Sequence, residues 1–179
     1  MVTTPATQTV GIEGLTVHVP HHYLALESLA KTHGVDPAKF SKGLGCIRMA
    51  VPHPTQDTVT MAVAALMDLL DRYDVDPQQV GLLVVGTETG VDSSKPISAY
   101  VHGVAGLPST CRVFDVQHAC YGATAGLQMA ASWATSPLSD GRKAIVIASD
   151  VARYTPGSPG EPTQGAGAIA MLVSTEPRI

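Results

Sequence analysis

The sequence contains few aromatic residues and no run of basic residues, and each scarcity argues against a class of protein. Aromatic residues make up 4% of the 179, whereas Gly (17) and Pro (13) are plentiful, a balance that favours an α/β domain with tight turns over a helical bundle. The net charge is -4, with no basic cluster, so the electrostatic footprint of a nucleic-acid-binding or membrane-surface protein is missing. We therefore expect neither nucleic acid nor a membrane as a partner.

Long apolar runs and paired cysteines are missing too. No window approaches the roughly 18 apolar residues of a membrane span, and residues 1–8 lack the features of a secretory signal, so we expect a cytoplasmic protein. Three cysteines at irregular spacing argue against a disulfide framework or a zinc site. These cysteines either pack in a core or carry thiol chemistry.

Apolar residues recur at spacings that alternate between those of strands and helices. Residues 57–73 repeat them every three or four positions, as an amphipathic helix does, and residues 80–86 form the continuous run of a strand covered on both faces. The pattern predicts one α/β domain with a mostly parallel or mixed sheet and helices on both faces. The expected strands span 9–19, 80–86, 111–116, 143–148 and 166–173, and the expected helices span 23–32, 57–73, 96–106 and 120–134, with a short helix begun by Asp36 and Pro37.

Cys120 is the first candidate for chemistry, because it stands where a strand gives way to a helix of small residues. Unpaired amides and the positive end of the helix dipole favour a thiolate at such a position. The alternative is a cysteine that packs in the core.

Glu88 directly follows the buried run that ends at Gly86. Open α/β sheets place their sites at strand ends, so Glu88 is a candidate general acid/base, with a solvated surface carboxylate as the alternative. The glycines of residues 160–168 come before a strand, whereas a dinucleotide fingerprint follows one. The seven histidines show no ligand spacing, so we expect no nucleotide and no metal.

Six segments together resemble the 3-hydroxy-3-methylglutaryl synthase family, in order along almost the whole chain. They are Gly11-Ile12 to Pro20; Gly43-Leu44-Gly45 with Met49-Ala50-Val51; Gly86-Thr87-Glu88-Thr89 with Asp92 and Ser94-Lys95; Ala119-Cys120-Tyr121-Gly122 with Thr124; Ser149-Asp150 with Tyr154; and Gly160 to Ala168.

The resemblance implies a thiolase-like fold, with residues 1–179 forming the amino-terminal half of a duplicated αβαβα layered sandwich. It implies that Cys120 takes an acetyl group from a coenzyme A or phosphopantetheine thioester. Glu88 would then remove a proton from the acetyl methyl group, so that the enolate attacks a β-ketone. No further cofactor is implied. The positions that the family keeps near the site or its thioester ligand are Asp36, Asp92, Tyr121, Asp150, Tyr154 and Thr163.

The sequence departs from the family in length and in two residues. Members are about twice as long and carry their catalytic histidine in the carboxy-terminal half, and no histidine here falls in a matching motif; Cys46 stands where the family usually has glutamine. Either a second polypeptide supplies the other half and its histidine, or the sequence is a fragment. A lone half would expose an apolar face and a sheet edge, so we expect a partner chain or a homo-oligomer.

Two branches of the family and two rival interpretations stay open. One branch condenses acetyl-CoA with acetoacetyl-CoA on the mevalonate route, and the other acts on acyl-carrier-protein thioesters in polyketide β-branching. Residues 88–92 with Lys95-Pro96, and residues 117–120, look slightly more like the second branch. The rivals are a condensing enzyme like ketoacyl synthase III, which lacks the Gly-Thr-Glu-Thr segment, and a non-catalytic half subunit.

Overall fold

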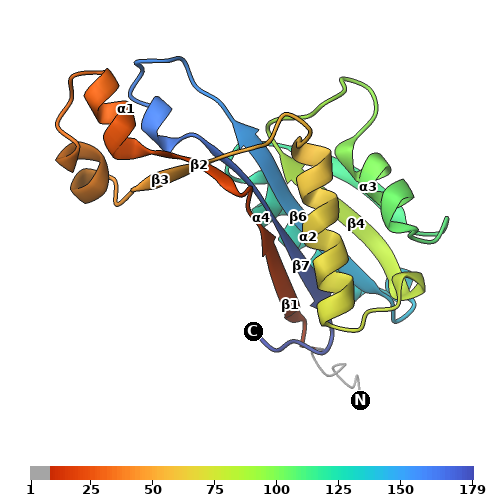
Figure 1. Ribbon diagram of the computed structural model, residues 1–179. Coiled ribbons are helices and arrows are strands. Elements are labelled where there is room, and N and C mark those ends of the chain that lie inside the picture. Colours follow the sequence, from red (N-terminus) through yellow and green to blue (C-terminus); the bar gives the residue numbers. More distant parts are fainter. Residues whose placement is uncertain (1–8) are drawn as a thin grey trace.

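Five strands form one mixed sheet in the computed structural model, which describes residues 9–179 (Figure 1). β4 is parallel to both β5 and β6, whereas β7 is antiparallel to β6 and to β1. All five predicted strands are confirmed, and β6 continues four residues past its predicted end at Ala148. In sheet order, the strands are β1 Gly11–His18, β7 Gly165–Ser174, β6 Lys143–Ala152, β4 Val80–Thr87 and β5 Arg112–Gln117.

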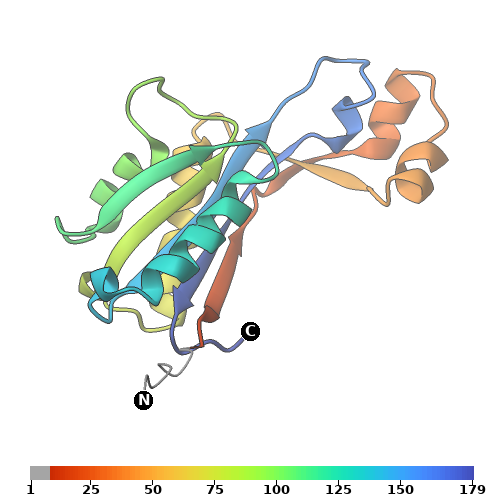
Figure 2. The same cartoon turned by 180° about the vertical axis from the view of Figure 1, so that it is seen from behind.

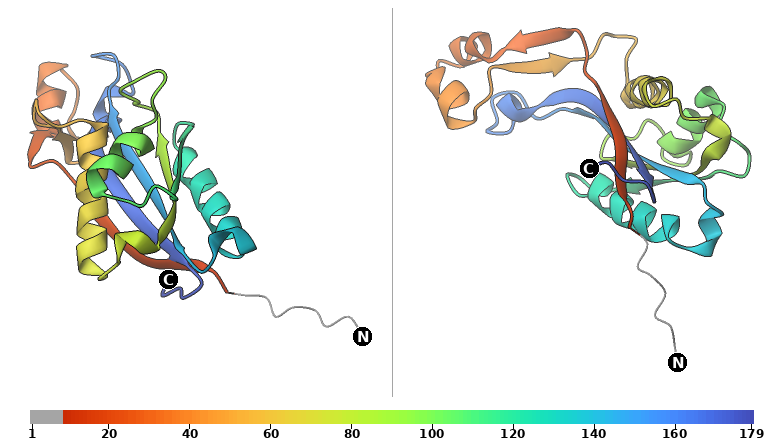
Figure 3. Two further views of the ribbon diagram at one scale, coloured as in Figure 1. Left: turned by 90° about the vertical axis from the view of Figure 1, so that its right-hand side faces the viewer. Right: turned by 90° about the horizontal axis from the view of Figure 1, so that it is seen from below.

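Helices cover both faces of this sheet, as predicted. α2 (Thr58–Arg72) and α3 (Ile97–Ala105) lie on one face, and α4 (Gly122–Ala134) lies on the other (Figures 2 and 3). Single turns of 3-10 helix span Pro77–Gln79 and Pro137–Ser139, and a third, Glu161–Thr163, lies in the β6–β7 loop. None of the helices in residues 9–179 combines the length and hydropathy needed to cross a membrane.

The core forms two layers that share β4. All eight residues of β4 are buried: Leu83 and Val85 pack with α2 and α3, while Leu82 and Val84 pack with α4. Successive side chains of a strand point to opposite faces, so a strand covered twice must be apolar at every position. The continuous apolar run in the sequence has this physical cause.

Residues 22–51 form an arm beside the end of β6 (Figure 1). It contains β2 (His22–Ala25), α1 (Leu26–Thr32), a π-helical turn (Lys39–Gly43) and β3 (Arg48–Val51), which pairs antiparallel with β2. The predicted helix over 23–32 is therefore wrong at its first three residues, and β3 was not predicted. Both short strands form because each supplies the other's backbone partners, a pairing that local periodicity cannot show.

Candidate active site

The two candidate chemical groups follow neighbouring parallel strands. Gly86 of β4 pairs with Val116 of β5; Glu88 comes one residue after β4, and Cys120 comes three residues after β5. Parallel strands end at the same edge of a sheet, where open α/β sheets place their sites. The structure therefore brings Glu88 and Cys120 to one edge from positions 32 residues apart (120 - 88 = 32).

Cys120 lies in a tight turn before α4. The helix begins at Gly122, two residues later than predicted, and the Gly122 amide donates to the His118 carbonyl at 2.8 Å. Cys120 has φ 41°, a left-handed conformation that costs a residue with a Cβ roughly 1 kcal/mol. Such conformations gather at functional sites because the surrounding structure must enforce them.

Exposure separates the three cysteines. Cys120 is exposed, Cys46 is half-buried and Cys111 is buried. Burial raises the pKa of the Cys111 thiol to about 11, although the charge of Arg142 opposes this shift. Because the thiolate is the nucleophile, Cys111 is unreactive near neutral pH. Cys120, the exposed cysteine, is the most accessible of the three to a thioester.

Two glycines set how closely α4 approaches the sheet. A Cβ on Gly86 would lie 2.6 Å from the Gly122 carbonyl carbon and 2.8 Å from Cα of Ala123, and a Cβ on Gly122 would lie 2.7 Å from the Val116 carbonyl oxygen. Ordinary carbon contacts are about 3.5 to 4.0 Å. The start of α4 therefore rests on the backbone of β4, two residues before Glu88, so the turn that carries Cys120 leads into a helix held against the strand that leads to Glu88.

The loop after β4 is held by the side chain of Asp150, which lies on β6. One carboxylate oxygen, Oδ1, accepts hydrogen bonds from the hydroxyls of Thr87 and Thr89, each at 2.8 Å, and from the amides of Glu88 at 2.8 Å and Thr89 at 3.1 Å. Every partner donates, a role for which a carboxylate is suited. Asp150 thus fixes the backbone at Glu88 while leaving the Glu88 side chain exposed.

A cavity of about 480 Å³ opens beside Glu88 and is bounded by the loop of residues 90–96. Asp92 shapes this loop: its Oδ1 accepts from the amides of Ser94 at 2.7 Å and Lys95 at 2.9 Å. The hydrogen bonds from Lys95 and Ser94 lower the pKa of Asp92. Asp92 therefore lines the cavity as a structural carboxylate of the loop.

Asp115 was missed by sequence reasoning, although it lines the same cavity. Its carboxylate accepts from the amides of Ile97 at 2.5 Å and Ser98 at 2.9 Å, at the start of α3. Asp115 therefore caps α3 from the neighbouring strand β5. Pro96, at the N-cap position itself, has no side-chain oxygen that could accept these hydrogen bonds. A cap supplied from another strand leaves no local sequence signal.

The other predicted site residues lie around this edge or farther away. Tyr121 is exposed and its hydroxyl donates to Gln128 at 3.2 Å. Tyr154 and Thr163 are exposed in the β6–β7 loop, and Thr163 shares a second cavity, of about 440 Å³, with Asp150. Asp36 lies in the arm, where its side chain accepts from the Ala38 amide at 2.9 Å. Of the predicted residues, Asp150 thus contacts Glu88 directly, through the Glu88 amide, whereas Asp36 lies in the arm.

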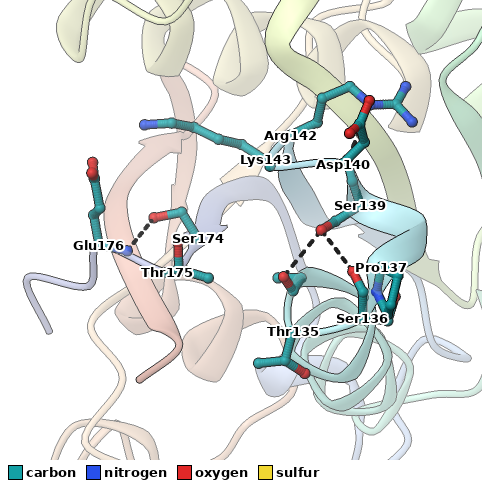
Figure 4. A pocket seen from close by; sticks show the side chains of 12 residues that line it. Thr135, Ser136, Pro137, Ser139, Asp140, Arg142, Lys143, Ser174, Thr175 and Glu176 are labelled. Atoms are coloured by element: carbon teal, nitrogen blue, oxygen red, sulfur yellow. Dashed lines mark hydrogen bonds between the residues drawn. The ribbon is translucent and has the colours of Figure 1, made fainter. Parts of the chain in front are cut away.

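A larger cavity of about 560 Å³ lies at the other end of the sheet and contains none of the predicted site residues (Figure 4). Most of its hydroxyls already have partners; for example, Ser139 donates to the Ser136 carbonyl at 2.9 Å, and Ser174 accepts from the Glu176 amide at 3.0 Å. Within residues 9–179 no three His, Cys, Asp or Glu side chains gather as metal ligands would. The edge that carries Cys120 and Glu88 therefore remains the candidate site.

Known proteins share this architecture. Residues 6–177 match the family model described as "Hydroxymethylglutaryl-coenzyme A synthase N terminal". The chain is 43% identical over 171 residues to the hydroxymethylglutaryl-CoA synthase of Enterococcus faecalis, covering 96% of this chain and 44% of that protein. It is 38% identical over 180 residues to PksG of Bacillus subtilis (strain 168), a polyketide biosynthesis 3-hydroxy-3-methylglutaryl-ACP synthase, covering 94% and 43%. The solved structure of MvaS in complex with 3-hydroxy-3-methylglutaryl coenzyme A has a TM-score of 0.91 at 53% identity, covering 94% of this chain and 40% of that one. The chain spans less than half the length of these relatives.

Proposed function

Because the chain belongs to the hydroxymethylglutaryl-coenzyme A synthase family, we propose that it contributes the nucleophile and the general acid/base of an acyltransferase that forms a carbon–carbon bond. The Cys120 sulfur attacks an acetyl thioester and releases the carrier thiol. Glu88 then takes a proton from the acetyl methyl group, and the resulting enolate carbon attacks the β-ketone of the acceptor, whose oxygen gains a proton. Water finally cleaves the thioester and frees Cys120.

The observation that carries this proposal is the pair of anchors at one sheet edge. The start of α4 rests on Gly86 and places the Cys120 turn, while Asp150 holds the backbone at Glu88. A nucleophile and an acid/base that act on the same two-carbon group must be held in a fixed mutual arrangement. We assign Asp92, Tyr121, Tyr154 and Thr163 to the walls of the thioester site, and Asp36 to contact with the carrier.

We further propose that a second polypeptide supplies the remaining half of the fold and its catalytic histidine. The sheet face beside α4 supports this, because Val17 and Val19 of the β1 segment are 57% and 53% exposed there, next to the cavity of about 440 Å³ that runs over Ala148 and Gly167. Exposed apolar surface of this kind marks an interaction site. Sedimentation should show a complex with the second-half polypeptide; a homo-oligomer without it would favour self-association, and a clean monomer with no affinity for that polypeptide would contradict the proposal.

For the acceptor we propose acetoacetyl-CoA, because the identities to the relatives named for coenzyme A, 43% and 53%, exceed the 38% to PksG. The second candidate is a β-ketoacyl chain on an acyl carrier protein, which residues 88–92 and 117–120 favour by their resemblance to that branch. Condensation by the complete, acetylated enzyme with acetoacetyl-CoA but not with a β-ketoacyl carrier protein supports the first candidate, and the reverse result supports the second.

Mass spectrometry of the chain after incubation with acetyl thioesters tests the chemical core of the proposal. One acetyl group should appear on Cys120, none should appear on Cys46 or Cys111, and Cys120→Ser should remove it. The experiment is run with and without the second-half polypeptide. Absence of acetylation in both conditions would favour the non-catalytic half subunit.

Condensation measured with Glu88→Gln in the complete enzyme tests the acid/base. The variant should still acetylate Cys120 but should lose condensation by at least about 100-fold, as expected for a general acid/base. Full condensation in this variant would favour the ketoacyl synthase III interpretation, in which no such glutamate acts.

A further inference from the structure

The loop that carries Glu88 is tied to the first turn of α2 as well as to Asp150. The hydroxyl of Thr58, the first residue of α2, donates to the Thr89 carbonyl at 2.9 Å and lies 3.1 Å from the Thr89 hydroxyl. The Thr58 carbonyl in turn accepts from the Ser149 hydroxyl of β6 at 2.8 Å. Thr58 and Ser149 are 2% and 1% exposed, so water cannot replace these bonds.

The direction of these hydrogen bonds follows from counting hydrogens. The Thr89 hydroxyl has one hydrogen, which it gives to Oδ1 of Asp150, and it accepts from the Val151 amide at 3.0 Å. Thr58 must therefore be the donor toward Thr89. Without the Thr58 hydroxyl, the Thr89 carbonyl would lose this partner on the side that the buried Thr58 side chain covers, and an acceptor left unsatisfied there favours movement of the segment that carries it.

We propose that Thr58 is a positioning residue for Glu88, acting through Thr89 from the face of the sheet that α2 covers. The inference rests on the proposed role of Glu88 and adds a residue outside the predicted site. Asp150 holds the loop from β6, and Thr58 holds it from α2, so the Glu88 backbone is fixed between two elements. A shift of about 1 Å at such a group is enough to lower a rate strongly.

Thr58→Val, which keeps the shape and removes the hydroxyl, is compared with Thr58→Ser, which keeps the hydroxyl. Thr60→Val is the matched control, because Thr60 lies on the same turn of α2. Its hydroxyl belongs to the capping box with Asp57 and accepts from the Asp57 amide at 2.7 Å. Within residues 9–179 it makes no hydrogen bond to the Glu88 loop. In the complete enzyme, Thr58→Val should lower condensation about tenfold at unchanged acetylation of Cys120, and Thr58→Ser should restore it. Thr60→Val should leave the ratio of condensation to acetylation at the wild-type value.

Amide hydrogen exchange of the chain provides a readout that needs no activity. The peptide over residues 86–92 should exchange about tenfold faster in Thr58→Val, and at the wild-type rate in Thr58→Ser and Thr60→Val. Wild-type exchange in Thr58→Val, or equal effects of Thr58→Val and Thr60→Val, would overturn the inference. If Glu88→Gln condenses normally, the proposed function fails instead; if Glu88→Gln is inactive while Thr58→Val is normal, only the role of Thr58 fails.

Discussion

Replacing Gly86 with alanine should displace Cys120, the proposed nucleophile, because this glycine lets α4 rest on the sheet. The new Cβ would lie 2.6 Å from the Gly122 carbonyl carbon, so the helix start must move by about 1 Å to restore an ordinary contact. The obstructing atoms are backbone and cannot rotate away. We therefore expect the free energy of unfolding to fall by about 3 kcal/mol, the upper end for overpacked cores, and the Cys120 turn to shift with the helix.

Gly103→Ala is the matched control for this change. Gly103 is an exposed residue inside α3, and a Cβ there meets no atom within 4 Å. Alanine is the better helix former, so this variant should raise the free energy of unfolding by about 1 kcal/mol. The same substitution is thus expected to act in opposite directions at two glycines, according to the space around each.

Urea denaturation measures both free energies, and mass spectrometry follows the rate of acetyl transfer to Cys120. The Gly86→Ala chain should transfer acetyl about 100-fold more slowly, the cost expected for a misplacement of about 1 Å, while Gly103→Ala should match the wild type. If Gly86→Ala unfolds at the wild-type urea concentration and Cys120 is acetylated at the wild-type rate, the contact between α4 and β4 does not position the nucleophile.

Three further predictions concern ionisable groups. Asp150→Asn keeps an acceptor oxygen but removes the charge from the hydrogen bonds to the Glu88 loop, so chemical denaturation should show a loss of about 1–3 kcal/mol. A thiol reagent at pH 8 should label Cys120 and spare Cys111. Because burial raises the Cys111 pKa to about 11 from 9.0, this thiol ionises in the unfolded chain before it ionises in the folded chain. The free energy of unfolding should therefore fall as pH rises from 9.0 to about 11, and Cys111→Ala should remove this fall. Burial opposes ionisation of Glu13, but hydrogen bonds from Lys143, at 2.6 Å, and Ser174 outweigh it and lower the Glu13 pKa. The stabilisation is present above pH 4.5 and is lost as pH falls below it. Glu13→Gln should therefore destabilise the chain by about 1–3 kcal/mol at pH 7 and by less near pH 3 in denaturation curves.

The sheet and its three long helices could be predicted because each buries a complete face. β4 is apolar from Val80 to Gly86 since it is covered twice, with Thr87 as its polar end, and the apolar period of α2 matches one buried stripe. The likeness to MvaS confirms the thiolase-like half expected from the sequence motifs. The arm could not be predicted in the same way, because β2 and β3 have four residues each and mostly exposed side chains. Their stability comes from pairing across more than twenty residues of sequence.

The members of the candidate site could be predicted singly, but their mutual arrangement could not. A strand-end carboxylate marks Glu88, and a cysteine before a helix marks Cys120. The bonds from Asp150 to the Glu88 loop depend on the register in which Gly86 lies opposite Ala148, and register between distant strands has no local signal. The left-handed backbone conformation of Cys120 could not be predicted from the sequence either, since cysteine has no preference for that conformation.

The proposed nucleophile and the proposed acid/base take part of their support from opposite faces of the sheet. The Cys120 turn precedes α4, which reaches Gly86 on one face, whereas the Glu88 loop is held by Thr58 at the start of α2 on the other face and by Asp150 of β6. A sheet edge between two helical layers can therefore hold two reacting groups through separate contacts, and a change in one layer need not move both. This partial separation gives a physical reason why the cysteine proposed to accept the thioester and the carboxylate proposed to abstract a proton can lie at adjacent strand ends and be adjusted separately: each strand carries its own residue, and α4 and α2 support different ones.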